Sequence, residues 1–404
     1  MLDSSALRAR FPALSGRTIY FENAGGSQLP DSVISAMTDY LRHHYVQVGA
    51  GYPASREATR IVEEAHAFAR RLVGAEAGQA ILGASTTVLL RLLADCHADI
   101  LPPKSEIVIH EAGHEANIGP WLRLVRGGHV IRWWRVDPAT QEAPLSGLDE
   151  LLNERTALVI LPQVSNLLGA VADVREVARL AHRVGARVVV DGVAFAAHRP
   201  VDVAAWDVDW YVFSTYKVYG PHMAVLYGSE AALAELTGPN HFFIPKESVP
   251  YKFELGGCNH EACAGLVGLG RYLNFAAGRP EEEPCRRETI VTAFRHFGEL
   301  ELPLQARLLE WLRGRKGVRI IGPATAGPER VPVISFRVEG RSSAAICREI
   351  DATEVALRQG HMYAYRLCTA LGIDPEDGVV RVSLLHYNTP AEVERLIGIL
   401  DGIL

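Results

Sequence analysis

The sequence predicts an α/β protein with a large domain built on a mostly parallel sheet and a smaller C-terminal α+β domain. Between residues 80 and 228, short uninterrupted apolar runs alternate with amphipathic stretches. This alternation is typical of strands that helices cover on both faces. Such sheets bind ligands beyond the carboxyl ends of their strands. Four polar residues lie at or just after predicted strand ends: His114, Asn166, Asp191 and Lys217.

The elements of the large domain follow from apolar spacing and local start signals. Pro30-Asp31-Ser32 opens the first helix, in which apolar residues recur every three or four positions. The predicted helices cover 31–48, 55–74 and 174–184, with another that includes 121–125. The predicted strands cover 107–110, 157–161, 188–191, 210–214 and 223–227, and one more ends near Gly83.

The last third of the chain predicts the smaller domain. Its strands are expected over 331–338 and 379–385, and its helices over 344–351 and 389–404. We expect the large domain and the N-terminal segment to cover residues 1–284. The small domain would then cover residues 285–404.

Composition excludes several classes of protein. The 404 residues are 48% hydrophobic and 22% charged, with a net charge of −6, so we expect no nucleic-acid or membrane partner. No signal peptide or membrane-spanning run is recognisable, which favours a cytoplasmic location. The six cysteines form no C-x-x-C pair. We therefore expect reduced thiols and no metal site.

Lys217 and Asp191 indicate the chemistry. Lys217 follows the apolar run 210–214 in a turn that Gly220-Pro221 closes, and Asp191 ends the buried run 188–191. A buried amine loses its proton readily and can attack an aldehyde. A buried carboxylate can pair with a protonated pyridine nitrogen. The two together can hold pyridoxal phosphate (PLP), with Lys217 as the Schiff-base residue.

The segment Gly83-Ala84-Ser85-Thr86-Thr87 ends a strand and opens a helix. Free amides and the helix dipole at such a place attract a phosphate. An ordinary helix cap is the alternative interpretation.

Taken together, these segments resemble the class V aminotransferase family of fold type I PLP-dependent transferases, and within it the cysteine desulfurase-like subgroup that lacks the catalytic cysteine. The resemblance covers almost the whole chain. The segments that carry it are 20–26, 114–117, 164–166, 191–192, 213–217, 219–221, 381–384 and 387–389.

The resemblance implies a set of site residues. Lys217 and His114 would be catalytic, with His114 stacked on the cofactor ring. The residues that would bind the cofactor are Lys217, Asp191, His114, Asn166, Thr86, Thr87, Ser214 and Tyr216. Arg381 would clamp the substrate carboxylate, a task that suits a guanidinium. The other residues expected on the substrate side are Ala24, Gly25 and Arg56. A structural His114, a turn-capping Asn166 and a surface ion pair of Arg381 are the alternatives.

The sequence departs from the family pattern at positions that affect the reaction. Residues 358–365, where desulfurases carry a mobile cysteine, contain none, and Tyr363 stands about where the thiol would be. Ala194 replaces a glutamine near the ring oxygen, and Tyr216 replaces a histidine. Cys258 follows Gly257 in place of a Thr-Pro pair. The catalytic roles of Cys258 and Tyr363 are open.

The leading hypothesis is a PLP-dependent enzyme that binds an α-amino acid as an external aldimine. We expect lyase-type cleavage at Cα or Cβ, such as C–S or other elimination, or natural-product tailoring. The alternatives are a class V aminotransferase, a cysteine desulfurase that uses a displaced cysteine such as Cys368, and a non-catalytic PLP-binding protein. The resemblance also implies a homodimer with shared active sites.

Overall fold

The computed structural model describes residues 3–404 and contains one large sheet of seven strands. The strand order is β2-β8-β7-β6-β5-β3-β4. All neighbouring pairs from β7 to β4 are parallel, and β8 runs antiparallel to both β2 and β7. The predicted, mostly parallel sheet is thereby confirmed. Its strands are β2 (Gln79–Gly83), β3 (Glu106–His110), β4 (Val130–Trp134), β5 (Thr156–Pro162), β6 (Arg187–Asp191), β7 (Trp210–Ser214) and β8 (Ala224–Gly228).

Helices cover both faces of this sheet, which is why its central strands are apolar throughout. Ile107 and Ile109 of β3 belong to the core beneath α4 (Thr86–Ala98) and α5 (Glu115–Leu122). Val108, the residue between them, belongs to the opposite core, with α7 (Val174–His182). Successive strand side chains point to opposite faces, so a strand covered on both sides needs apolar residues at every position.

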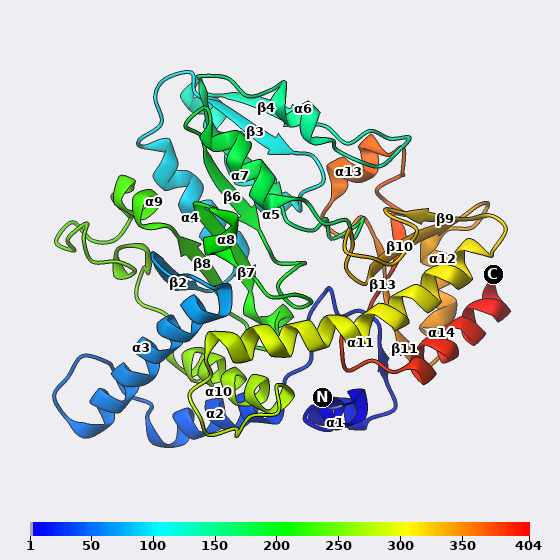
Figure 1. Cartoon of the computed structure of the whole chain (residues 1–404), viewed down its shortest axis with the longest axis horizontal. Helices are drawn as coiled ribbons and strands as arrows, with labels where there is room; N and C mark the ends of the chain where they lie inside the picture. Colours follow the sequence, from blue (N-terminus) through cyan, green and yellow to red (C-terminus); the bar gives the residue numbers. More distant parts are fainter. Residues whose placement is uncertain (1–2) are drawn as a thin grey trace.

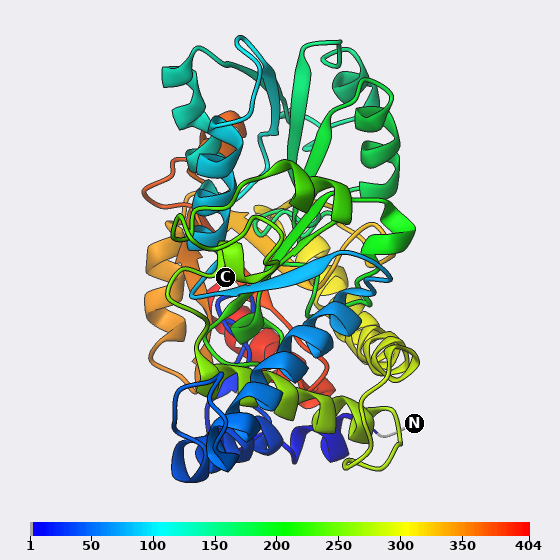
Figure 2. The same cartoon turned by 90° about the vertical axis from the view of Figure 1, so that its left-hand side faces the viewer.

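Three helices from distant parts of the sequence pack together at the lower end of the molecule (Figure 2). They are α2 (Asp31–His43), α3 (Pro53–Val73) and α10 (His260–Ala276). The helix predicted over 31–48 ends at His43. Beyond it the buried Ser55 hydroxyl donates to the Gln47 carbonyl (2.6 Å) and accepts from the Ala50 N–H (2.9 Å), which fixes a turn instead of a further helical turn.

The C-terminal part forms a four-stranded sheet in the order β12-β13-β10-β9. Its strands are β9 (Val318–Ile321), β10 (Val333–Val338), β12 (Arg358–Gly360) and β13 (Val379–Ser383), and its helices include α12 (Ser343–Ile350) and α14 (Pro390–Ile403). A two-stranded pair of β1 (Ile19–Tyr20) with β11 (Val355–Ala356) ties the N-terminal segment to it. These elements agree with the predicted α+β pattern.

The long helix α11 (Arg287–Arg313) joins the two parts (Figure 1). Phe294 and Phe297 in its first half belong to the core of the large sheet, whereas Leu308 and Leu312 in its second half belong to the core of the small sheet. We keep a domain division near residue 285 as a proposal, just before this helix begins.

The remaining elements are short and lie in the connections. They are α1 (Ser4–Arg8), η1 (Pro12–Ser15), η2 (Arg123–Gly127), α6 (Leu145–Asp149), α8 (Val203–Trp206), η3 (Thr215–Lys217), α9 (Glu230–Glu235), η4 (Tyr251–Phe253) and α13 (Tyr365–Ala370). Within residues 3–404, no helix combines the length and the apolar character that crossing a membrane requires.

Candidate active site

A cavity opens at the carboxyl ends of β6 and β7, where the sequence places its candidate residues. Asp191 is the last residue of β6, Ser214 is the last residue of β7, and Lys217 ends the η3 turn that follows. The residues that line the cavity are Ser85, Thr86, Thr87, His114, Ala116, Pro162, Val164, Asn166, Asp191, Val193, Ala194, Ser214, Tyr216 and Lys217. All eight predicted cofactor-binding residues are therefore brought together.

One end of the cavity is the N-terminus of α4. Ser85 caps this helix, and its hydroxyl accepts a hydrogen bond from the Val88 N–H at 3.2 Å. Thr86 is buried, and its Oγ1 lies 2.7 Å from Oγ of Ser214 at the end of β7. Two hydroxyls and the free amides of a helix start therefore face one place, which is a suitable environment for a phosphate group.

The other polar groups on the cavity floor are a carboxylate and an amine with shifted pKa values. Burial raises the pKa of Asp191 to about 6, although the Val193 N–H and the Lys217 charge lower it. Burial lowers the pKa of Lys217 to about 8, and the nearby Arg381 cation acts in the same direction. Both shifts follow from the cost of keeping a charge away from water.

His114 stands at the wall of the cavity as the N-cap of α5. Its Nδ1 accepts a hydrogen bond from the Ala116 N–H at 3.0 Å, so a proton on the neutral ring lies on Nε2. Burial, with Lys217 and Arg381 nearby, lowers the pKa of His114 to about 4. The ring of Tyr363 stacks on this imidazole, with a centroid distance of 5.1 Å and an angle of 25°. The exposed Tyr363 therefore contacts a residue of the cavity wall, although it does not itself line the cavity.

Asn166 and Arg381 connect the cavity to the four-stranded C-terminal sheet. The Asn166 Nδ2 donates to the Met362 carbonyl (2.7 Å), and Nη1 of Arg381 donates to the Asn166 carbonyl (3.2 Å). Arg381 is buried, and burial lowers its pKa to about 10. The Asn166 Oδ1 and the Arg381 Nε are buried and have no hydrogen-bond partner among residues 3–404. Two unpaired buried polar atoms at one place indicate a site for a polar ligand.

The turn that contains Ala24 and Gly25 lies on the end of β13, next to Arg381. The Ala24 N–H donates to the Ser383 hydroxyl at 2.8 Å. A Cβ on Gly25 would come within 2.7 Å of Oε1 of Glu22 and 3.1 Å of the Glu22 carbonyl oxygen, so a larger residue would require the Glu22 side chain to move. Sequence reasoning missed that Glu22 pairs with Arg358 (2.6 Å). A contact between residues so far apart in sequence leaves no local signal.

Tyr216 lines the cavity, whereas Arg56 lies outside it. The Tyr216 ring stacks on His222 at 4.9 Å and 16°, and its carbonyl accepts from the Ser27 N–H at 3.0 Å. Arg56 lies on the surface at the start of α3, where its guanidinium donates to the Gly51 carbonyl, and it does not line the cavity of this single chain. A role of Arg56 in substrate binding remains a proposal that requires a second subunit.

The sequence model of the class-V aminotransferases matches residues 19–396. The aminotransferase-like protein FGM3 of Gibberella zeae is 38% identical over 98% of each chain. A nonribosomal peptide synthetase-like enzyme, fsqF of Aspergillus fumigatus, is 35% identical over 98% of this chain and 26% of its own length. The cysteine desulfurase-like protein ustD of Aspergillus flavus is 32% identical over 100% of this chain and 91% of its own.

Solved structures agree with this result. The cysteine desulfurase from Thermococcus onnurineus NA1 superposes with a TM-score of 0.88 and 26% identity, over 100% of this chain and 98% of its own. The cysteine desulfurase CsdA from Escherichia coli gives a TM-score of 0.84 and 25% identity over the same shares. A cavity with a lysine, a buried aspartate and a helix N-terminus, together with these matches, leads to one conclusion: the chain belongs to the class V aminotransferase family and is a PLP-dependent enzyme of fold type I on a cysteine desulfurase-like scaffold.

Proposed function

We propose that this enzyme acts on an α-amino acid by breaking a bond at Cα or Cβ, as a lyase or a natural-product tailoring enzyme, and does not pass sulfur to a cysteine. The observation that carries the proposal is the turn after β12, where Tyr363 and not a cysteine contacts His114. The similarity to a nonribosomal peptide synthetase-like enzyme supports the tailoring role.

The residues of the cavity fit PLP. Asp191 is a buried carboxylate that forms no ion pair with an arginine within residues 3–404, so it can pair with a protonated pyridine nitrogen. Ser214, Thr86 and the start of α4 would hold the phosphate, with Thr87 at the rim. When bound, PLP withdraws electrons from the bonds at the α carbon of an amino acid.

Lys217 would serve both as the attachment point of the cofactor and as the group that moves a proton. Its lowered pKa leaves a substantial neutral fraction near pH 8, so Nζ can accept a proton from the substrate α carbon. His114 would remain neutral, because its pKa is about 4, and would offer its Nε2–H as a hydrogen-bond donor. Packing against Tyr363 would fix the plane of this ring.

Arg381 would orient the substrate. Its Nη1 is held by the Asn166 carbonyl, while its buried Nε has no partner among the described residues. A substrate carboxylate would satisfy this donor, and two parallel hydrogen bonds would fix the substituents of Cα relative to the cofactor. Ala24 and Gly25 would border the same space, and Asn166 would lie beside the cofactor ring.

Cys368 is poorly suited to be the sulfur acceptor that the cysteine desulfurase alternative requires. This residue is fully buried in α13 among apolar side chains, and burial raises the pKa of its thiol to about 11. A thiol that is neither exposed nor ionised is a poor acceptor of sulfur. The transaminase alternative requires an amino acceptor, which the test below includes.

The test incubates the holoenzyme with a panel of amino acids, cysteine included, with and without a keto acid as the amino acceptor, and identifies products by mass spectrometry. We expect products of elimination or of bond formation at Cβ from at least one amino acid, and no rapid release of alanine with persulfide from cysteine. Lys217→Ala is the control and should lose both turnover and the borohydride-reducible link to PLP.

Two results would overturn the proposal. Rapid formation of alanine and persulfide from cysteine would make the enzyme a desulfurase. Efficient amino transfer to a keto acid, with no cleavage product from any amino acid, would make it an aminotransferase.

A further inference from the structure

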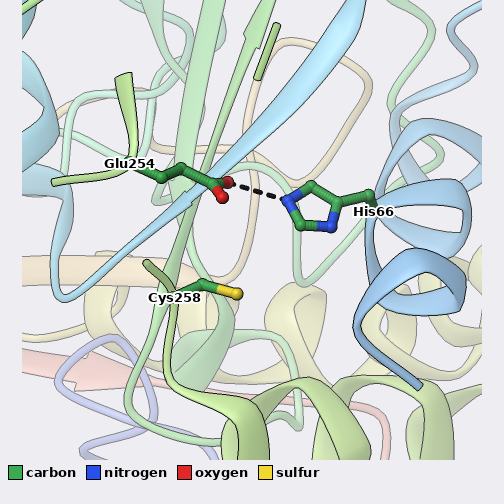
Figure 3. Close-up of side chains that lie close together, drawn as sticks. All are labelled: His66, Glu254 and Cys258. Atoms are coloured by element: carbon green, nitrogen blue, oxygen red, sulfur yellow. Dashed lines mark hydrogen bonds and ion pairs between the residues drawn. The ribbon is translucent and has the colours of Figure 1, made fainter. Parts of the chain in front are cut away.

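Three side chains with metal-binding atoms converge outside the cofactor cavity (Figure 3). His66 comes from α3, Glu254 directly follows η4, and Cys258 precedes α10. One ligand atom from each lies within 4.8 Å of the others. None of the three lines the PLP cavity. The cluster is therefore a separate site.

The His66 ring already has the orientation of a metal ligand. Its Nδ1 lies 2.8 Å from the Val62 carbonyl, which can only accept, so Nδ1 carries a proton. The Nε2 therefore faces Glu254, at 2.8 Å from Oε1. Metal-binding histidines usually donate their second ring N–H to a backbone carbonyl or carboxylate, which fixes both the tautomer and the ring plane.

Glu254 is held in the same manner. Its Oε1 accepts a hydrogen bond from the Leu82 N–H of β2 at 2.8 Å, and its side chain is only 5% exposed. Figure 3 shows its second oxygen on the side of Cys258. A backbone donor on one oxygen leaves the other oxygen for a cation, as in sites whose carboxylate ligands are themselves hydrogen-bonded.

A second thiol lies beside the cluster. The Sγ of Cys263, in the first turns of α10, is 3.5 Å from the Sγ of Cys258. Two thiolates on one tetrahedral zinc ion, with Zn–S bonds of about 2.3 Å, lie about 3.8 Å apart. The spacing Cys-x4-Cys is within the range of zinc sites. The two sulfurs are thus close to the separation that a shared ion needs.

We propose that His66, Glu254 and Cys258 bind one zinc-class divalent ion, and that Cys263, whose Sγ contacts that of Cys258, becomes the fourth ligand when its sulfur moves towards His66 and Glu254. A set of two thiolates, an imidazole and one carboxylate suits Zn²⁺ and not Mg²⁺ or Ca²⁺, which prefer oxygen ligands only. On binding, the thiol protons and the proton between His66 and Glu254 pass to solvent. The ion would tie α3, the strand end at Leu82 and the start of α10 together.

The test uses the full-length holoenzyme, reduced with a phosphine, stripped with a chelator, loaded with Zn²⁺ and desalted. Bound zinc is measured by atomic emission, and we expect one ion per chain. Cys258→Ser and Cys263→Ser should each weaken binding by about 100-fold or more. Cys347→Ser, which changes a buried thiol in the small domain, is the matched control and should retain the ion.

His66→Gln separates the metal from the ion pair. Glutamine can keep a hydrogen bond to Glu254 and so preserve the fold, but it is a poor zinc ligand. This variant should remain folded by circular dichroism and lose the ion. With Co²⁺ in place of Zn²⁺, the wild type should show ligand-field bands of a tetrahedral thiolate site, and Cys258→Ser should not.

Several outcomes would overturn the proposal. One is that the reduced protein binds no more zinc than a sample whose thiols have been alkylated. Another is equal binding in wild type and Cys258→Ser. A third is that the bound zinc is lost when PLP is removed, which would show that the zinc binds to the cofactor. A Cys258–Cys263 disulfide that re-forms immediately in air while zinc does not bind the reduced thiols would identify a redox pair instead.

Discussion

At the scale of residues, the site is defined by charges that burial makes costly. Asp191 and Arg381 both lie close enough to Lys217 to affect its charge, and burial shifts the pKa of each of the three in the direction that favours its neutral form. Arg381 adds to the effect on Lys217, because two cations disfavour each other. A buried carboxylate, a reactive amine and a fixed guanidinium are together what binding of a cofactor and an amino acid requires.

Replacing Arg381 with lysine tests the carboxylate clamp. Lysine keeps the charge and loses the planar fork. The charge-assisted bond contributes roughly 1.5–3 kcal/mol, so we expect kcat/KM to fall by about one to two decades. PLP content, measured by absorbance after release in alkali, should not change. Arg319→Lys, an exposed position on β9 of the same sheet, is the control. A variant that loses PLP but keeps full turnover per bound cofactor would show that Arg381 is structural.

The lowered pKa of Lys217 predicts a pH dependence for PLP attachment. Only the neutral amine attacks, so the attachment rate of the apoenzyme should rise up to about pH 8 and level off above it. The attachment rate of a free lysine derivative, whose ordinary pKa is about 10.4, should continue to rise above pH 8. Trapping with borohydride at timed intervals measures the rate. Arg381→Met should move the inflection to higher pH, since it removes a cation that lowers this pKa. A wild-type inflection above pH 10 would contradict the assignment.

At the scale of elements, the close packing of β6 against β7 positions Asp191. Gly192 directly follows Asp191, and its N–H donates to the Val212 carbonyl of β7 at 2.8 Å. The buried Tyr211 ring lies over this glycine, and its hydroxyl donates to Gln163 at 2.6 Å. Asp191 therefore lies beside a contact between two strands that leaves no room for a side chain at position 192.

Gly192→Ala should disrupt this contact. An added Cβ would come within 2.0 Å of the Tyr211 ring, which the hydrogen bond to Gln163 holds in place. Overpacking of this kind costs about 1–3 kcal/mol, so the denaturation midpoint should fall and PLP affinity should weaken. Gly398→Ala in α14, where nothing lies within 4 Å, should instead stabilise the fold by about 0.5–1 kcal/mol. Urea unfolding measures the stability of both variants. A Gly192→Ala variant as stable as the wild type would contradict the expected clash with Tyr211.

At the scale of the whole molecule, one exposed apolar segment indicates how chains associate. Between α9 and α10, Phe242 is 100% exposed, Phe243 is 65% exposed and Leu255 is 56% exposed. Large apolar side chains gathered on a surface usually mark an interface. We propose that they pack against a second copy of the chain, in a homodimer that brings residues such as Arg56 to the partner's active site.

Replacing Phe242 and Phe243 with serine together should weaken this dimer. Light scattering after gel filtration should give twice the chain mass for wild type and a concentration-dependent fall towards the monomer for the double variant. Val125→Ser, another exposed apolar position, should stay dimeric. Activity of the double variant should fall with its dimer fraction if the active sites are shared. A wild type that is monomeric and fully active would contradict the proposal.

The sequence alone determined the central strands of the sheet and, through the family resemblance, the cofactor, but it did not predict the edge strand β4. The local signals suffice because strands buried on both faces must be apolar at every position, and because parallel strands deliver Asp191 and Ser214 to the same edge. The helix start at Thr86 is equally local, since a cap and its first turn are neighbours in sequence. The family assignment rests on the same short segments, and the comparisons confirm it.

Only the tertiary structure decided which distant residues meet. The stacking of Tyr363 on His114 and the hydrogen bond from Asn166 to Met362 join residues about two hundred positions apart or more. The same holds for His66 and Glu254, which no sequence spacing connects. The sequence therefore led us to expect no metal site and gave no sign of this cluster. Such contacts depend on how helices and loops pack on the sheet, and that packing is a property of the whole core and not of any one segment.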